Sequence, residues 1–155
     1  KMGIIDFLDE QSVNYELTEH EPAFSAQRMA AAEHEPGRFV AKPVSVRADE
    51  RYYMAVLPAP HRVNLNAFKE LVGAEKAELA EEDEIGRIFD DCQVGAEPPF
   101  GNLYDLPTIM EQSLEKDEHI AFQAGSHEKA VRMTMEDYRR LVQPKVGAFS
   151  YESTS

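Results

Sequence analysis

The chain has 155 residues, 43% of them hydrophobic, and its 29 acidic residues against 16 lysines and arginines give a formal net charge of −13 at pH 7. A chain of this length buries about 70% of its unfolded surface around one core, so we expect a single domain that needs neither a disulfide nor a structural metal. The apolar runs are too short to cross a bilayer, and the acidic excess argues against an extended basic face for duplex DNA. We therefore expect no membrane and no DNA among its partners. A strongly negative surface also keeps proteins soluble at high salt, which is an alternative origin of the charge.

The N-terminal residues and the cysteine content favour a cytoplasmic location. Residues 1–12 carry Asp6 and Glu10 where a signal peptide would have an uncharged apolar segment. Cys92 is the only cysteine, so no internal disulfide can form, and a reducing compartment fits this usage. The lone thiol could act as a nucleophile beside a histidine, but a cysteine close to Phe89 is more typical of an apolar packing residue.

Hydrophobic spacing and turn residues predict the elements of the first half of the chain. In order, they are a helix at 3–11, a strand at 15–18, a helix at 27–33, a hairpin of strands at 39–47 and 51–57, a helix ending at 72, and a helix at 81–90. Ser25 is a suitable N-cap for the second helix and Asn64 or Asn66 for the third, which Gly73 ends.

From residue 94 onward the pattern changes. Residues 94–101 cannot form regular structure, because Pro98 and Pro99 lack backbone donors. Strands follow at 106–110, 119–124 and 130–133, and Thr134 with Asp137 predicts the start of a helix that runs to residue 142. Consecutive strands mixed with strands joined through helices predict an α/β domain of the mixed α+β type. We place this domain at residues 2–147 and expect a frayed polar tail at 148–155.

The sequence lacks the common signatures of cofactor and metal chemistry. It contains no glycine-rich dinucleotide fingerprint, no phosphate-binding loop and no nucleophile elbow. Its five histidines do not stand at a zinc-site spacing from one another or from Cys92. We therefore expect neither a cofactor nor a metal.

Lys42 is unusual because it lies inside the apolar strand segment 39–44. In a half-buried strand its side chain points either into a cleft or to solvent, depending on the register. Pattern alone favours a solvated lysine without a buried partner, whose replacement would leave stability nearly unchanged. The neighbouring Pro43 indicates an edge or a bulge, and bulges can re-aim side chains beside sites.

Two glycine-containing segments are candidate ligand-binding loops. Residues 95–101 are stiffened by prolines and can present backbone N–H groups at low entropic cost, although a tight helix-to-strand connection explains them equally well. Residues 124–127 (Ala-Gly-Ser-His) end an apolar strand with a glycine that lets a ligand approach the backbone. A plain hairpin turn is the alternative for that segment.

Taken together, these segments resemble the YbaK/ProX family of aminoacyl-tRNA deacylases, which includes the editing insertion of bacterial prolyl-tRNA synthetases. The similar stretches occur in the family's order between residues 2 and 147. They are His-x-Pro-Ala-x-Ser at 20–25, the strand ending in the lysine at 37–42, Val-Leu-Pro-Ala at 56–59, Gly-x-x-x-Pro-Phe-Gly at 95–101, and Ala-Gly-Ser-His at 124–127. Pro43 departs from the family, which usually has Thr or Asn after the lysine, and this departure removes a side-chain hydrogen bond.

The resemblance implies a mixed, partly barrel-like β-sheet flanked by helices, with a pocket for the aminoacylated 3′ end of tRNA. The implied reaction is hydrolysis of the ester of a mischarged tRNA in trans, assisted by the substrate's own ribose hydroxyl and without a metal or cofactor. An aminoacyl-tRNA synthetase is a further candidate partner. Such a second pocket is useful because a synthetase site separates amino acids that differ by a methylene by only about 1 to 3 kcal/mol.

The resemblance also implies roles for individual residues. Lys42 and His127 are the implied catalytic residues: Lys42 would hold the terminal phosphate or the ester carbonyl, and His127 would be a polar residue of the pocket. The implied substrate-binding residues are Gly95, Pro99, Phe100, Gly101, Gly125, Ser126, His20 and Ser25. The competing hypothesis, favoured by Pro43, is a non-catalytic module that binds a small molecule or a tRNA 3′ end without turnover.

Overall fold

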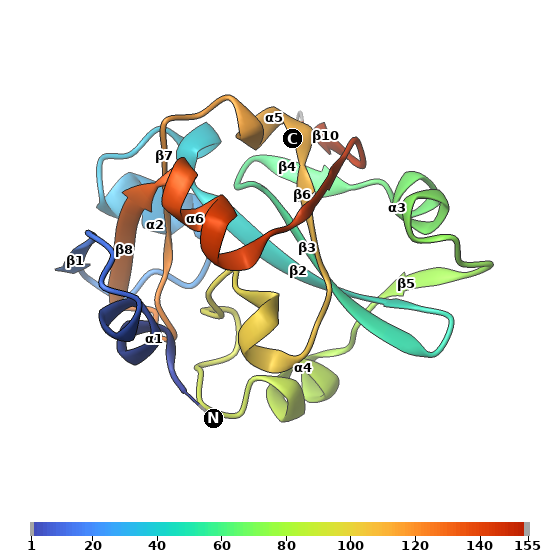
Figure 1. The fold of residues 1–155 in the computed structure, drawn as a ribbon, viewed down its shortest axis with the longest axis horizontal. Coiled ribbons are helices and arrows are strands. Elements are labelled where there is room, and N and C mark those ends of the chain that lie inside the picture. Colours follow the sequence, from blue (N-terminus) through green and yellow to red (C-terminus); the bar gives the residue numbers. More distant parts are fainter. Residues whose placement is uncertain (1, 154–155) are drawn as a thin grey trace.

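The computed structural model describes residues 2–153, which fold around a long central hairpin with helices on its flanks (Figure 1). The helices are α1 (Ile4–Glu10), α2 (Ala26–Ala32), α3 (Leu65–Val72), α4 (Glu82–Ile88), α5 (Gln112–Glu115) and α6 (Met135–Val142). The strands are β1 (Glu16–Glu19), β2 (Ala41–Ala48), β3 (Arg51–Pro58), β4 (His61–Val63), β5 (Ala77–Leu79), β6 (Thr108–Glu111), β7 (His119–Gln123), β8 (Lys129–Thr134), β9 (Lys145–Gly147) and β10 (Ser150–Glu152). Short 3-10 turns occur at Gly37–Phe39 and Gly101–Tyr104.

The sheets combine parallel and antiparallel pairs. The largest sheet has the order β5-β2-β3-β6-β9, in which β2 and β3 are antiparallel while β3, β6 and β9 run parallel. A second sheet has the order β1-β8-β7, and a parallel bridge between Val40 and Ala121 links β7 to the start of β2. The predicted mixed α+β arrangement of sheets flanked by helices is therefore confirmed, and this bridge joins the two larger sheets.

Local sequence signals set most of the helix ends. The Ser25 hydroxyl accepts a hydrogen bond from the Arg28 N–H at 3.1 Å, which fixes the first turn of α2. Asn64, rather than Asn66, caps α3 through the Ala67 N–H at 3.1 Å. Gly73 ends that helix at φ 70°, a left-handed conformation that favours glycine.

The predicted frayed tail is wrong for the part of it that the structure describes. Phe149 is only 1% exposed and packs edge-on against Phe68, and its N–H donates to the buried Glu111 carboxylate at 2.8 Å. Residues 150–152 then form β10, which pairs antiparallel with β4. Because one aromatic residue anchors the segment, its otherwise polar composition does not make it fray; residues 154–155 lie outside the described part of the chain.

The surroundings of Pro43 explain how a proline fits inside β2. The Ala59 N–H donates to the Val40 carbonyl, so the backbone groups of Val40 face β3. In an antiparallel ladder this direction alternates along the strand. The backbone N–H groups of even-numbered residues of β2 therefore point toward β3, and those of odd-numbered residues point away from it. On the other side, β5 pairs only with Val46–Ala48. The nitrogen of Pro43 therefore faces a stretch without a partner strand, as the edge interpretation expects, and no ladder hydrogen bond is lost.

The main hydrophobic core lies directly behind the predicted binding loop. The ring of the fully buried Phe100 contacts those of Phe7, Phe122 and Tyr138, at centroid distances of 5.3 to 6.1 Å. These contacts fix the end of the 94–101 segment against α1, β7 and α6. No helix within residues 2–153 has the length and apolar character required to cross a membrane.

Candidate functional site

A cavity of about 200 Å³ lies where the start of β2, the beginning of α2, the end of β7 and the loop before Pro98 come together. The residues around it share a position at the end of an element or in a loop. They are Ser25, Ala26, Val40, Ala41, Lys42, Pro43, Gly95, Glu97 and Gln123. Four segments far apart in the sequence therefore build one site, and it includes three of the sequence-predicted site residues: Lys42, Ser25 and Gly95.

Lys42 places a half-buried ammonium group at this cavity. Its Nζ donates to the Ala59 carbonyl, in the β3–β4 connection, at 3.1 Å and to the carbonyl of His61, the first residue of β4. Burial lowers the pKa of Lys42, and the positive charge of Arg62 lowers it further. An ammonium group has three N–H donors, so two bonds to carbonyls orient it and leave one for a ligand. The expectation that this lysine lacks a buried partner is therefore wrong.

Glu97 is a polar residue of the cavity that sequence reasoning did not single out. It is 7% exposed, and its carboxylate accepts a hydrogen bond from the N–H of Gly95. Burial raises the pKa of Glu97, while the N–H groups of Gly95, Ala96 and Glu97 itself, together with His127, oppose the shift. The loop was expected to offer backbone donors to a ligand, but here Glu97 takes the Gly95 N–H. The signal in the sequence was an acidic residue inside an otherwise apolar, proline-rich loop.

His127 lies beside the cavity and holds two loops together. Its Nδ1 is 3.2 Å from the Ala23 carbonyl oxygen and its Nε2 is 2.9 Å from the Val94 carbonyl oxygen. Both partners are acceptors, so only a ring protonated on both nitrogens donates to both. The ring also lies against Gly95, where an added Cβ would stand 3.3 Å from His127 Cε1. This geometry favours a positioning role for His127 over proton transfer to a ligand.

The other residues of the first motif and of β7 organise the neighbourhood of the cavity. The buried Gln123 lines the cavity and donates to the Ala23 carbonyl at 2.8 Å; the sequence gave no signal for it beyond its place at the end of a strand. His20 does not line the cavity: its Nδ1 is 2.6 Å from the Glu21 carbonyl oxygen, and its Nε2 is 3.8 Å from a Glu33 carboxylate oxygen.

The Pro-Phe-Gly end of the loop lies behind the cavity and supports it from the core. The Pro99 carbonyl accepts a hydrogen bond from the buried Tyr138 hydroxyl at 2.6 Å, and Phe100 is fully buried. A Cβ added at Gly101 would stand 2.3 Å from Thr108 Oγ1, so only glycine fits there. None of these three predicted residues is brought to the cavity.

Gly125 and Ser126 border a separate hollow of about 270 Å³ near Cys92. Gly125 has φ 87°, and its N–H donates to the Ala96 carbonyl at 2.8 Å while its carbonyl accepts from the Gln93 N–H at 2.9 Å. Gly125 therefore braces the loop of Gly95 through the backbone. Burial raises the pKa of Cys92 to about 12, so this thiol is not poised as a nucleophile.

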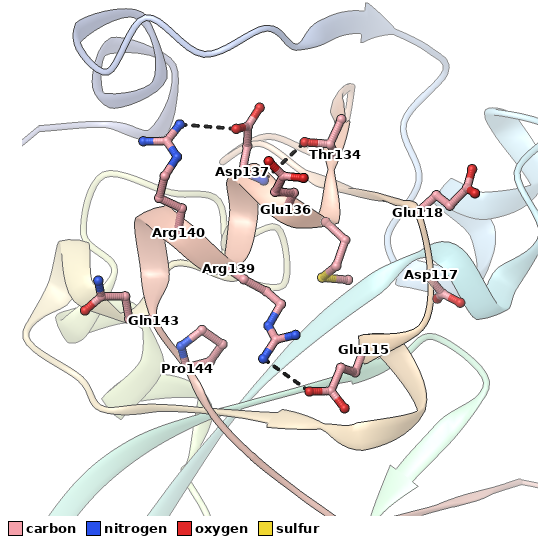
Figure 2. A pocket seen from close by; sticks show the side chains of 11 residues that line it. Glu115, Asp117, Glu118, Thr134, Glu136, Asp137, Arg139, Arg140, Gln143 and Pro144 are labelled. Carbon is pink, nitrogen blue, oxygen red and sulfur yellow. Dashed lines mark hydrogen bonds and ion pairs between the residues drawn. The ribbon is translucent and has the colours of Figure 1, made fainter.

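A larger hollow, about 930 Å³, lies elsewhere, between α5 and α6 (Figure 2). It is wide open, and four of the charged side chains that line it form two ion pairs. Arg139 reaches across it to Glu115 at 3.2 Å, and Arg140 pairs with Asp137 at 3.2 Å on its own helix. We place the candidate site at the smaller cavity, because buried charged groups converge there. Within residues 2–153, no group of three or more His, Cys, Asp or Glu side chains could hold a metal ion.

Comparison with known proteins identifies the class to which this fold and cavity belong. The model of the aminoacyl-tRNA editing domain family matches residues 20–141, a range that includes every residue lining the cavity. The chain belongs to this family, as the sequence motifs had indicated.

Individual relatives match nearly the whole chain. The prolyl-tRNA editing protein ProX of Acetoanaerobium sticklandii is 24% identical, over 96% of this chain and 94% of its own length. The multifunctional Ser/Thr-tRNA deacylase ProXp-y of Escherichia coli K12 is 28% identical, over 94% of this chain and 90% of its own length. The crystal structure of a proposed trans-editing enzyme for prolyl-tRNA synthetase superposes with a TM-score of 0.82 at 18% identity, over 93% of this chain and 92% of that one.

Proposed function

We propose that this protein hydrolyses the ester bond of mischarged aminoacyl-tRNA in trans. The observation that carries the proposal is a small cavity lined by the half-buried Lys42 and the buried Glu97, two side chains of opposite charge. They are not paired with each other, because each is bonded to backbone groups instead. An α-aminoacyl ester at a tRNA 3′ end carries an ammonium group next to the polar ester carbonyl, and the 5′-phosphate is attached to the same ribose, so the substrate offers a partner for each. Membership of the editing family and the activities named for ProX and ProXp-y support this choice.

In this proposal Lys42 contacts the ester carbonyl or the terminal phosphate. Its two bonds to the Ala59 and His61 carbonyls fix the ammonium before the substrate arrives, so little reorganisation is needed as negative charge develops on the carbonyl oxygen. The exposed Arg62 adds positive charge near the same end of the cavity. A local positive spot suffices for one tRNA end, even on a chain of net charge −13.

Glu97 is suited to the α-ammonium group of the substrate. Its buried carboxylate is anchored by the Gly95 N–H through one oxygen, which leaves acceptor positions for a cation. No metal is part of the proposed reaction: the attacking water is assisted by the ribose hydroxyl beside the ester. His127 and Gly125 hold in place the two loops beside the cavity, the one before Ser25 and the one that contains Gly95.

The cavity volume limits the substrate. About 200 Å³ accommodates a small aminoacyl group, whereas the rest of the tRNA must stay outside. An aminoacyl-tRNA synthetase that releases the mischarged product is the partner that would supply this substrate, and a cytoplasmic location follows from that source.

The deciding experiment is a panel of mischarged tRNAs incubated with the protein, with release of the amino acid measured in single turnover. We expect release from at least one tRNA charged with a small amino acid. Binding of these tRNAs without release from any of them would instead support the non-catalytic module. Pro43, which had favoured that alternative, is in register with Val56 of β3 and turns its nitrogen toward the side of β2 where no strand pairs, so it is compatible with either function.

A further inference from the structure

An exposed aromatic residue stands directly beside the cavity. Among the large hydrophobic side chains of residues 2–153, Phe24 is the most exposed, at 68%. It immediately precedes Ser25, which lines the cavity. Exposing an aromatic ring forgoes the burial that normally stabilises it, so a ring left open at the edge of a binding site is suited to a ligand.

The position of Phe24 is fixed by its neighbours. Its ring lies 4.8 Å from the His127 ring, centroid to centroid, at an angle of 49°. His127 is itself held between the Ala23 and Val94 carbonyls, and the Ala23 N–H donates to the His127 carbonyl at 2.8 Å. Phe24 is thus an exposed ring on a rigid support.

A second exposed apolar side chain extends the same surface. Val94 is 42% exposed and bonds through its carbonyl to the other side of His127. We call Phe24, His127 and Val94 the aromatic rim. The rim borders the cavity, because His127 lies against Gly95 and Phe24 adjoins Ser25.

We propose that Phe24 is the stacking platform for the 3′-terminal base of the tRNA, with His127 supporting its ring. This inference rests on the proposed function. The ester and the terminal base are attached to the same ribose, so a base whose aminoacyl group occupies the cavity must lie within one nucleoside of the cavity mouth. Aromatic side chains bind single-stranded bases by stacking on them, and this requires an open ring face rather than a basic surface. The aromatic rim therefore supplies affinity that an acidic chain cannot obtain from an extended set of phosphate contacts.

The chain contains no tryptophan, which makes the stacking directly measurable. Phe24→Trp introduces the only indole, and its fluorescence can be titrated with the CCA trinucleotide, with adenosine 5′-monophosphate, and with ribose 5-phosphate, which has no base. We expect a saturable change with the first two ligands and none with ribose 5-phosphate. The control is Leu79→Trp, at a 54% exposed position of β5 that lines no part of the cavity, which should respond to none of them.

Kinetics provide the second readout. Phe24→Ala should raise KM for the mischarged tRNA substrate about tenfold or more while changing kcat little, and Phe24→Trp should restore the parent KM. An unresponsive indole at position 24, or an equal response to ribose 5-phosphate, would overturn the stacking platform. Deacylation with an unchanged KM in Phe24→Ala would also overturn it while leaving the proposed function intact. A base-dependent fluorescence response in a protein that releases no amino acid would contradict the proposed function and retain the platform.

Discussion

At the scale of single residues, Lys42 is the side chain on which the proposed chemistry most depends. Lys42→Ala should reduce single-turnover deacylation by about 10² to 10³, the usual effect of losing one donor to a developing oxyanion. Lys42→Arg should also lose rate, because a planar guanidinium does not reproduce a compact point charge. The same Lys42→Ala protein should be less stable by about 1 to 3 kcal/mol, since the substitution removes the donor from two carbonyls.

A matched lysine separates these two effects. Lys145 donates to the Leu71 carbonyl at 2.7 Å on the far side of the main sheet and lines no part of the cavity. Lys145→Ala should retain full deacylation in the same assay. A fully active Lys42→Ala protein would contradict the assigned mechanism.

Glu97 should make stability depend on pH in a defined direction. Because burial raises its pKa above 4.5, the folded protein holds this proton more tightly than the unfolded chain does. As pH rises from about 4.5 through the raised pKa, the parent should therefore lose stability relative to Glu97→Gln, which does not titrate, and the difference should then level off. Urea unfolding of both proteins between pH 5 and 8 measures it. If the parent instead became more stable relative to Glu97→Gln as pH rises over this range, the fold would favour the charged carboxylate, and this would contradict a raised pKa of Glu97.

Activity should depend neither on the thiol nor on a metal. The pKa of about 12 leaves Cys92 protonated at neutral pH, so Cys92→Ala should keep nearly the full rate and the parent thiol should react slowly with a disulfide reagent at pH 8. Treatment with EDTA should also leave deacylation unchanged. Loss of activity on either treatment would require different chemistry at the site.

At the scale of elements, the C-terminal strand is coupled to the site. His61 provides a carbonyl to Lys42, its Nδ1 is 2.8 Å from the Ser150 hydroxyl, and β4 pairs with β10. Truncation after residue 147 should therefore destabilise the protein by about 3 to 5 kcal/mol, as Phe149→Ala should, because either change empties a buried aromatic site. Thermal melts of the two variants check this expectation. A truncated chain with the same melting temperature as the parent would support the domain boundary at residue 147 that the sequence had predicted.

At the scale of the whole molecule, the charge of −13 predicts how binding responds to salt. If only the terminal nucleotides are bound, raising salt from about 50 to 200 mM should weaken tRNA binding far less than the roughly 10³-fold loss typical of six or more phosphate contacts. Filter binding or anisotropy with uncharged tRNA measures the slope. A steep slope would reveal an extended basic footprint and contradict recognition limited to the 3′ end.

Local patterns in the sequence determined the elements whose cause is local. Ser25, Thr134 and Gly73 mark helix ends through their own hydrogen bonds or backbone freedom, and the central hairpin follows from two apolar segments on either side of a polar turn. The family could also be predicted, because its motifs are contiguous stretches in a fixed order. The three-residue strands β4, β5, β9 and β10 escaped prediction, because such short segments are strands only through the partners they pair with.

Which of the predicted site residues line the cavity and which face the core depends on how the chain folds in three dimensions. Lys42 and Gly95 meet at the cavity, whereas Phe100 and Gly101, in the same motif as Gly95, face the core behind it. Glu97 belongs to the site because the fold buries its carboxylate at the cavity, and no local sequence pattern predicts that burial. Motif order reports which residues a family shares, but whether a side chain touches ligand or core depends on contacts between segments a hundred residues apart, and these exist only in the folded chain.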